Sequence, residues 1–322
     1  MNLLDIHKEL NTEAKCIAFL EHMRWPDGVK CLSCQSPRIT PILAKGKLNK
    51  KTGKRSPDRE LYQCNECRFQ FTATTGTVYH DTHLPLTSWF LAIALITESK
   101  KGISAAQLSR ALGVQYRTAW YLAHRIRKAM VDANPPKLTG VVEMDETYIG
   151  GKQRGHRRKK YNKECVVGIR ERGGDLRLIH TVDATAELLG KHMQDHVDPN
   201  VKMFITDEWP AYPAALKSAG IHELQHHTIR HKDHVYVQGP IYTNTVESAF
   251  SLFKRGIVGA FHKVSLKHLQ RYLNEFSFRF NNRKSPDLFG MTVRKMALAG
   301  NLPYAKLIEE TAFTPFIRPK KA

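Results

Sequence analysis

The amino-acid sequence predicts a multi-domain protein in which a small cysteine-containing module and a helical module precede a layered α/β domain. Three observations indicate this order. Four of the six cysteines stand in two Cys-x-x-Cys pairs near the start of the chain. The spacing of apolar residues becomes helical from Pro85, and predicted strands and helices alternate after Asn134-Pro135-Pro136. A chain of 322 residues has room for about two or three such folded units.

Charge is the unusual feature of the composition. The chain has 50 Lys and Arg residues against 30 Asp and Glu residues, a formal net charge of +20. This charge favours a polyanionic partner, and nucleic acid is the leading candidate. A basic protein on a membrane surface is the alternative, but the longest apolar run, Trp89 to Ile96, is far shorter than the roughly 20 residues of a spanning helix. Asp5, Glu9 and Glu13 argue against a signal peptide, so we expect a cytoplasmic protein.

The first part of the chain predicts a zinc ribbon after a short helical lead-in. Apolar residues have helical spacing up to the turn signal Trp25-Pro26-Asp27-Gly28, so residues 1–27 are the lead-in and residues 28–80 the ribbon. Each Cys-x-x-Cys pair presents two thiolates, and two pairs complete a tetrahedral zinc site with no open position. We therefore expect structural Zn²⁺ rather than disulfides or four unligated thiols. The ligands are Cys31, Cys34, Cys64 and Cys67.

Residues 81–133 are predicted to form a helix-turn-helix. Three short helical patterns follow one another, with a turn at Gly113 before the last of them, Gln115 to Met130. Helical packing domains without a DNA role show similar patterns, so a solvated basic helix is the alternative. Polar side chains that open the last helix can reach base edges, and basic ones further along can meet phosphates. The candidate DNA-contacting residues are Gln115, Tyr116, Arg117, Thr118, Arg125 and Arg127.

Residues 137–290 are predicted as an α/β domain with the element order β-β-β-α-β-α-β-α. This is the order of a ribonuclease-H-like domain, which is a layered α/β architecture. The remaining residues, 291–322, are expected to form a C-terminal tail. The predicted strands are 140–144, 164–170, 175–182, 201–206 and 222–229, and the helices are 185–196, 212–218, a segment from 246 to 254, and 266–280.

Three acidic residues of this domain are candidate metal ligands. Asp145 and Asp207 each end a predicted strand, so the two can emerge side by side from neighbouring strands. Glu247 stands close to two helical turns before Lys254, which places both side chains on one face. Three converging carboxylates can hold two Mg²⁺ ions roughly 3.5–4 Å apart around a phosphodiester, with the lysine as a phosphate anchor. Each acid alone is typical of a cap or a solvated residue, but their joint placement favours the metal site.

The predicted α/β domain contains two other polar clusters, one of basic residues and one of histidines. The segment Lys152 to Lys163 has seven basic residues and no acid, and we predict a hairpin arm that contacts the DNA backbone rather than a merely solvated loop. Histidines at 222, 226, 227, 231 and 234 lack regular ligand spacing, so a second zinc site is not expected. The DNA-contacting candidates of the arm are Lys152, Arg154, Arg157, Arg158, Lys159 and Lys160.

At these residues the chain resembles the DDE insertion-sequence transposases, specifically the bacterial group with an N-terminal zinc ribbon. The resemblance implies that Asp145 and Asp207 are the first two catalytic acids and Lys254 the accompanying basic residue, with Mg²⁺ or Mn²⁺ as cofactor. In this group an asparagine can stand in the third place, so Glu247 and Asn244 both qualify. We favour Glu247, because a charged ligand holds Mg²⁺ better. The motifs are the cysteine ribbon, Met144-Asp145-Glu146-Thr147-Tyr148-Ile149-Gly150-Gly151, Thr206-Asp207-Glu208-Trp209, and Thr243-Asn244-Thr245-Val246-Glu247 through Ser251-Leu252-Phe253-Lys254-Arg255.

The predicted function is a transposase that acts at the nucleoid of a bacterial cell. It would bind the terminal inverted repeats of its element, hydrolyse a strand there, and join the freed 3′-hydroxyl to target DNA by two-metal phosphoryl transfer. Transposition processes both ends of the element and normally needs more than one active site, so a homo-oligomer on double-stranded DNA is expected. The rival functions are a structure-specific nuclease on the same fold and a zinc-ribbon DNA-binding regulator with a non-catalytic α/β domain.

Overall fold

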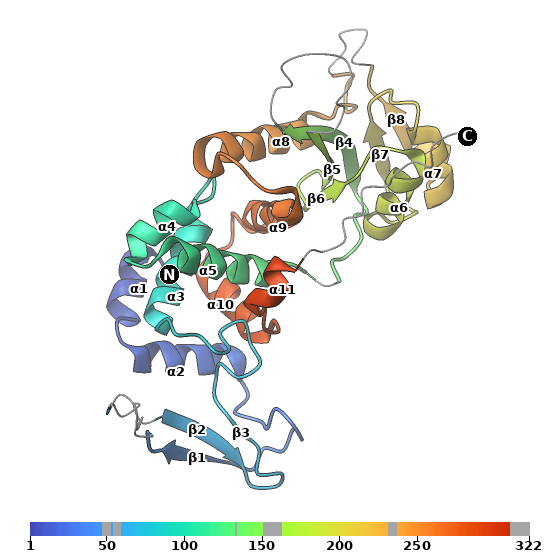
Figure 1. Ribbon diagram of the computed structural model, residues 1–322. Helices are drawn as coiled ribbons and strands as arrows, with labels where there is room; N and C mark the ends of the chain where they lie inside the picture. Colours follow the sequence, from blue (N-terminus) through green and yellow to red (C-terminus); the bar gives the residue numbers. More distant parts are fainter. Residues whose placement is uncertain (47–52, 54–58, 133, 151–162, 231–236, 310–322) are drawn as a thin grey trace, which may run out of the picture. The chain divides into compact units, whose positions relative to one another are not determined.

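The chain divides into two compact units, which are described separately (Figure 1). The computed structural model describes residues 1–46, 53, 59–132, 134–150, 163–230 and 237–309. Unit 1 contains residues 1–98, 105–129 and 286–307, and unit 2 contains residues 99–104, 130–285 and 308–322. The expected arm residues Lys152 to Lys160 lie outside the described part. Within the described part, no helix is long and apolar enough to cross a membrane.

Unit 1 is built mainly from helices. The lead-in forms α1 (Leu3–Glu9) and α2 (Glu13–Arg24), and their first turns are capped by the side chains of Asn2 and Thr12. The expected helix-turn-helix segment forms α3 (Leu86–Glu98), α4 (Ala105–Leu112) and α5 (Tyr116–Ala129). Gly113 between α4 and α5 has a φ of +65°, a backbone conformation that favours glycine. Three helices are therefore present where the sequence predicts them.

The expected C-terminal tail contains two helices that complete unit 1. They are α10 (Leu288–Leu298) and α11 (Tyr304–Ile308). Phe289, Val293 and Met296 of α10 are buried, at helical spacing. The ring of Phe289 packs against Phe90 of α3 at 5.7 Å between centroids. The prediction of a tail from residue 291 is corrected, because this apolar stripe returns the chain to the core of unit 1.

The cysteine module forms a three-stranded antiparallel sheet in the order β1-β2-β3. Its strands are β1 (Ile39–Ala44), β2 (Arg59–Cys64) and β3 (Gln70–Phe71). The rings of Trp25, Tyr62 and Phe71 pack together with centroids 5.8–5.9 Å apart. The Tyr62 hydroxyl donates to Glu21 Oε1 at 2.9 Å, and Arg24 donates to the carbonyl of Ala73 at 2.6 Å. These contacts fasten the sheet to the end of α2.

Unit 2 is organised around a five-stranded mixed sheet in the order β6-β5-β4-β7-β8. Strands β4 (Val141–Gly150), β5 (Lys163–Glu171) and β6 (Leu176–Thr181) are antiparallel. Strands β7 (Met203–Thr206) and β8 (His226–Thr228) extend the sheet in parallel with β4. The element order is the predicted one, with a 3₁₀ turn (Glu223–Gln225) at the start of the last expected strand.

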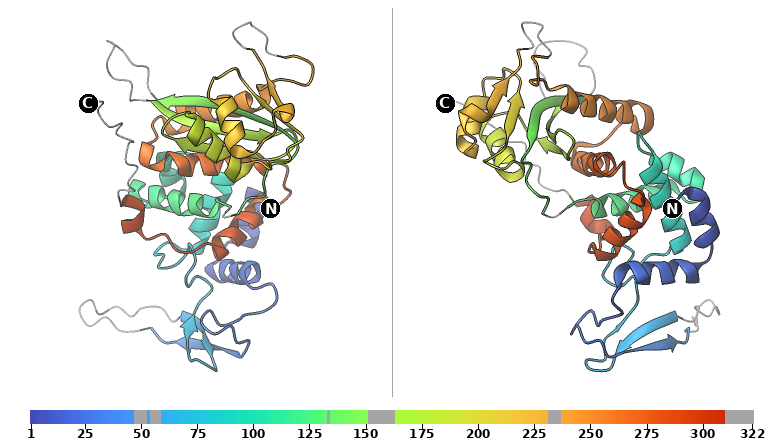
Figure 2. Two further views of the ribbon diagram at one scale, coloured as in Figure 1. Left: turned by 90° about the vertical axis from the view of Figure 1, so that its right-hand side faces the viewer. Right: turned by 180° about the vertical axis from the view of Figure 1, so that it is seen from behind.

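Two helices cover each face of this sheet, as Figures 1 and 2 show. On one face lie α6 (Ala186–His196) and α7 (Tyr212–Ala219), which pack on Val142 and Met144. On the other face lie α8 (Asn244–Gly256), a π-helical turn (Ile257–Phe261) and α9 (Leu266–Asn281). A Cβ at Gly168 of β5 would meet Phe250 of α8 at 2.6 Å, so a glycine here lets α8 lie close to the sheet.

Candidate functional site

The four cysteines form one compact group in unit 1. Their sulfur atoms all lie within 4.8 Å of one another. Cys31 Sγ is 3.5 Å from Cys67 Sγ, and Cys34 Sγ is 3.6 Å from Cys64 Sγ. A tetrahedral zinc ion with Zn–S bonds of about 2.3 Å separates its sulfurs by roughly 3.8 Å. The donor set and its spacing therefore fit structural Zn²⁺.

Both Cys-x-x-Cys pairs adopt the same tight turn. Gln35 N donates to the carbonyl of Cys31 at 3.1 Å, and Arg68 N donates to that of Cys64 at 3.0 Å. Gln35 and Arg68 both have a φ of +61°. Burial raises the pKa of Cys31, but hydrogen bonds from the backbone N–H groups of Cys34 and Ser33 and from neighbouring thiols outweigh this and lower it to about 6. For Cys34 the backbone hydrogen bond of Ser36 lowers the pKa, but burial and the neighbouring thiols outweigh it and raise the pKa to about 12. The first turn thus favours the thiolate that zinc requires at Cys31.

The acids of unit 2 lie at the centre of the sheet. Strand β4 continues to Gly150, so Asp145 is in the middle of the strand and not at its end as the sequence suggested. The parallel register pairs Glu143 with Ile205, which brings Asp145 level with Asp207, just beyond the end of β7. β4 and β7 are neighbouring strands, as expected, but Asp145 does not end its strand and Asp207 lies one residue past the end of β7.

The charges near Asp145 identify its neighbours. The pKa of Asp145 is raised to about 8, first by burial and then by the negative charges of Glu146, Asp207 and Glu247. Among the described residues, only the four cysteines have three or more ligand atoms all within 4.8 Å, so the carboxylates are more widely spaced. They interact electrostatically and offer the oxygen ligands that hard divalent cations prefer.

Helix α8 brings Glu247 and Lys254 to the face of β4 that carries Asp145. Lys254 Nζ donates a hydrogen bond to Thr147 Oγ1, and Thr147 stands two residues after Asp145 on the same face. Glu247 is half-buried in the first turn of α8, and its Oε1 accepts a hydrogen bond from the Thr243 hydroxyl at 2.9 Å. Asn244 begins the same helix and is exposed. The structure therefore brings Asp145, Glu247 and Lys254 to one region.

Glu143 fixes the position of this helix, and sequence reasoning assigned it no role. Its side chain is fully buried and accepts hydrogen bonds from Thr245 N and Val246 N, both at 3.0 Å, and from Thr245 Oγ1 at 2.7 Å. Arg172 Nε donates to its other oxygen at 2.6 Å. A carboxylate at a helix N-terminus is stabilised by the orphan N–H groups and the helix dipole. Glu143 thus joins β4 to the start of α8.

We expect Glu143→Ala to destabilise unit 2 by about 3–5 kcal/mol, because it leaves the half-buried Arg172 without its carboxylate and the first N–H groups of α8 without their acceptor. Urea unfolding followed by circular dichroism measures this. Glu187→Ala, which removes an exposed acid at the start of α6, is the control and should change stability by less than about 0.5 kcal/mol. Equal stabilities for the two variants would contradict the role of Glu143.

Glu146 is a second acid that sequence reasoning left out of the site. Tyr212 of α7 donates its hydroxyl hydrogen to Glu146 Oε2 at 2.8 Å, so Glu146 faces α7. Burial and the charge of Asp207 raise the pKa of Glu146. In the sequence, only the position of Glu146 next to Asp145 pointed to a place near the site. Side chains alternate along a strand, so the two acids are expected to face opposite sides of the sheet.

The DNA-contacting candidates of α5 divide into two groups. Gln115, Tyr116 and Arg117 are exposed and Thr118 is half-buried, as a binding surface requires. Arg125 and Arg127 are only 4% and 2% exposed, so the prediction that they meet phosphates is corrected. Every residue of α5 from Leu122 to Arg127 is buried, so tertiary packing there overrides the basic pattern.

The histidines make local contacts. His222 Nδ1 accepts a hydrogen bond from Leu224 N at 3.2 Å, and His226 Nε2 lies 2.9 Å from Thr206 Oγ1. His231 and His234 lie outside the described residues. In the part that the structure describes, these histidines form no metal-binding group.

The cysteine module and the mixed-sheet domain match two family models, and both describe transposases. Residues 137–281 match the ISXO2-like transposase domain, and residues 11–70 match the transposase zinc-ribbon domain. The chain carries both domains in that order, and the resemblance predicted from its motifs is confirmed.

A particular relative supports the same conclusion. A protein of Halobacterium salinarum, described as an uncharacterized protein in the transposable element ISH50, is 28% identical over 290 residues. The matched region covers 84% of this chain and 92% of that protein. The matched region is therefore longer than either matched domain alone.

Proposed function

We propose that the protein is a metal-dependent DNA transposase that cleaves strands at the ends of its element and joins the 3′-hydroxyl to target DNA. The observation that carries this proposal is the placement of Asp145 level with Asp207, with α8 bringing Glu247 and Lys254 to the same face. A ribonuclease-H-like fold for unit 2 is part of the proposal, supported by its strand order.

The residues of the proposed site hold cations, contact phosphate or position helix α8. Asp145, Asp207 and Glu247 hold divalent cations, and like-charge repulsion among them is relieved when positive charge lies between them. Bound Mg²⁺ or Mn²⁺ supplies charge neutralisation and an activated water for an in-line displacement at phosphorus. Lys254, fixed by Thr147, provides a point charge for a phosphate oxygen. Glu143 positions α8 so that these groups meet.

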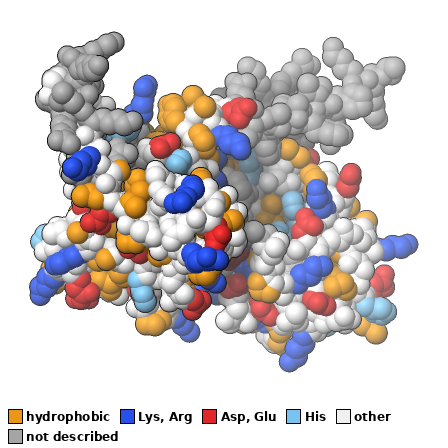
Figure 3. Space-filling model, turned by 90° about the horizontal axis from the view of Figure 1, so that it is seen from below, with side chains coloured by type: hydrophobic (Ala, Val, Ile, Leu, Met, Phe, Trp, Pro, Cys, Tyr) orange, Lys and Arg blue, Asp and Glu red, His pale blue; other side chains and the backbone are white. Residues whose placement is uncertain are grey.

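DNA recognition is assigned to unit 1. The ribbon and the proposed helix-turn-helix of α4 and α5 would bind the terminal repeats, with Gln115, Arg117 and Thr118 nearest the bases. On the face seen in Figure 3, Lys and Arg side chains are mixed with Asp and Glu side chains. The described surface on that face is therefore of mixed charge. Phosphate contacts by the arm residues Lys152 to Lys160, a homo-oligomer on DNA, and a cytoplasmic location at the nucleoid complete the proposal.

The test is a strand-transfer assay with the unmutated protein, Mg²⁺, and a labelled duplex that contains the element's own end. We expect a nick at the element end and a product in which that end is joined to target DNA. Cleavage without joined products would support a structure-specific nuclease. End binding without any cleavage would support the zinc-ribbon regulator and contradict the proposal.

The third metal ligand can be decided by two substitutions on α8. We expect Glu247→Gln to lower the cleavage rate by roughly 10²-fold or more, because it removes a charged ligand beside Asp145. Asn244→Ala should retain cleavage within about tenfold of the unmutated rate, because the exposed amide carries no charge. Single-turnover cleavage at several Mg²⁺ concentrations measures both. The reverse order of effects would assign the third place to Asn244.

A further inference from the structure

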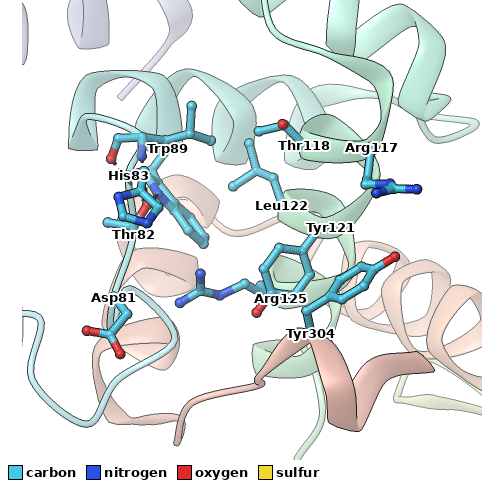
Figure 4. Close-up of a pocket in the computed structure, with 11 residues that line it drawn as sticks. Asp81, Thr82, His83, Trp89, Arg117, Thr118, Tyr121, Leu122, Arg125 and Tyr304 are labelled. Carbon is cyan, nitrogen blue, oxygen red and sulfur yellow. Dashed lines mark hydrogen bonds between the residues drawn. The ribbon is translucent and has the colours of Figure 1, made fainter. Parts of the chain in front are cut away.

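Unit 1 contains a pocket beside the exposed end of α5 (Figure 4). Its volume is about 380 Å³, which lies within the roughly 300–1,000 Å³ range of small-ligand sites. The lining combines residues of α3 and α5 with the first residue of α11 and with residues 81–84, among which Asp81 adds a carboxylate. The lining residues that matter here are Trp89, Arg117, Tyr121, Leu122, Arg125 and Tyr304.

Arg125 gives the pocket a fixed cationic wall. Its guanidinium lies 5.0 Å from the ring centre of Trp89 and 5.3 Å from that of Tyr121. One terminal nitrogen donates to the carbonyl of His80 at 2.6 Å. Its Nε–H is buried and has no hydrogen-bond partner in the described structure. Because this Nε has almost no accessible surface, a ligand in the pocket would meet the positive charge of the guanidinium and not this donor.

Two tyrosines form the aromatic part of the wall next to Arg125. Tyr121 and Tyr304 meet edge to face with ring centres 5.4 Å apart. The Tyr121 hydroxyl donates to the carbonyl of Leu302 at 2.6 Å, which fixes its ring. Tyr304 remains 38% exposed, so part of its ring is free for a ligand. With buried Leu122, these rings favour a flat ligand with an apolar face.

The pocket lies beside the residues of α5 that are proposed to contact DNA. Arg117 and Thr118 line it and also belong to the turn that opens α5, next to exposed Gln115 and Tyr116. DNA bound along this end of the helix would lie across the pocket. Among the groups that DNA offers, a base is flat, stacks on aromatic and guanidinium planes, and carries hydrogen-bond acceptors. A phosphate is strongly hydrated and suits the exposed Arg117 at the rim better than apolar walls.

We propose that this pocket binds one base of the element's end that is turned out of the duplex. This inference rests on the DNA-binding part of the proposed function. The base would lie against the exposed part of the Tyr304 ring, beside the positive charge of the Arg125 guanidinium.

The experiment uses the full-length zinc-loaded protein and a duplex of the element's end with 2-aminopurine at each position in turn. We expect one position at which binding changes the fluorescence several-fold, because the base leaves the stack. A mismatch at that position should tighten binding by about tenfold, since pairing no longer opposes extrusion. Tyr304→Ala should lose both effects. Tyr304→Phe should keep them, because the ring remains.

Leu298→Ala is a matched control, since Leu298 is 68% exposed in unit 1 and does not line the pocket. Fluorescence anisotropy measures DNA binding in every variant, and zinc content and circular dichroism verify folding. Binding with no fluorescence response at any position, or a response that persists in Tyr304→Ala, would overturn the inference and leave the proposed function intact. Failure of the unmutated protein to bind the end would contradict the proposed function itself.

Discussion

Asp207→Asn is expected to abolish strand cleavage while leaving binding to the element's end intact. The substitution removes a negative charge beside Asp145 but keeps a side chain of the same shape, including an oxygen for the hydrogen bond from Trp209 N. Loss of a ligand to a catalytic cation removes several kcal/mol of transition-state stabilisation, so cleavage should fall by roughly 10³-fold or more. Single-turnover cleavage and anisotropy on the same labelled duplex measure the two properties.

Asp198→Asn is the control for this experiment. Asp198 caps the turn before β7 through a hydrogen bond from Asn200 N at 2.8 Å and lies outside the acid group. It should keep cleavage within about threefold of the unmutated rate, because a surface cap contributes to stability only modestly. Cleavage by Asp207→Asn at the unmutated rate would remove Asp207 from the proposed site. If the unmutated protein never cleaves DNA and Asp207→Asn keeps the same DNA binding and regulatory effect, the zinc-ribbon regulator would be favoured.

Loss of zinc is the second large effect, and it should act on DNA binding. Cys64→Ser should release the ion and unfold the β1–β3 sheet. The binding free energy of structural zinc, about 10–16 kcal/mol in small zinc peptides, exceeds what this small sheet gains from its own core. That core consists of Cys31, Cys64 and Phe71 with a few half-buried neighbours. We expect zinc content near zero and loss of specific end binding.

Cys16→Ala distinguishes zinc loss from the general cost of removing a buried thiol. Cys16 is fully buried in α2, and its Sγ donates to the carbonyl of Leu10 at 3.3 Å. This variant should lose about 1 kcal/mol of stability yet retain one zinc ion and end binding. Zinc is measured by metal analysis after dialysis. A Cys64→Ser protein that keeps its zinc would contradict the four-cysteine site.

The sequence was sufficient where local pattern decides structure. Strand alternation and helical spacing predicted the element order of unit 2 because each element buries one face. The spacing of the cysteine pairs predicted their convergence, since a tight turn fixes each pair. The spacing from Glu247 to Lys254 likewise predicted one helical face, and Lys254 does contact β4 on the face of Asp145. The convergence of Glu247 with Asp145 agrees with the raised pKa of Asp145.

The sequence did not predict contacts between residues that lie far apart in the chain. Strand β4 continues past Asp145 because β5 pairs with it up to Gly150, and nothing local to residues 145–150 reveals that partner. Arg125 is held by Trp89 and the carbonyl of His80, contacts that a basic helical pattern does not show. Glu143 acts on Thr245 and Val246, about a hundred positions later in the chain.

The most direct test of the account asks where a divalent cation binds. Fe²⁺ can replace Mg²⁺, and with ascorbate and peroxide it generates hydroxyl radicals that cut the backbone close to the ion. We predict cuts near residues 145, 207 and 247, suppressed by excess Mg²⁺ and absent in Asp145→Asn. Cuts confined to other segments, or cuts that Asp145→Asn leaves unchanged, would contradict the claim that these acids form one metal site.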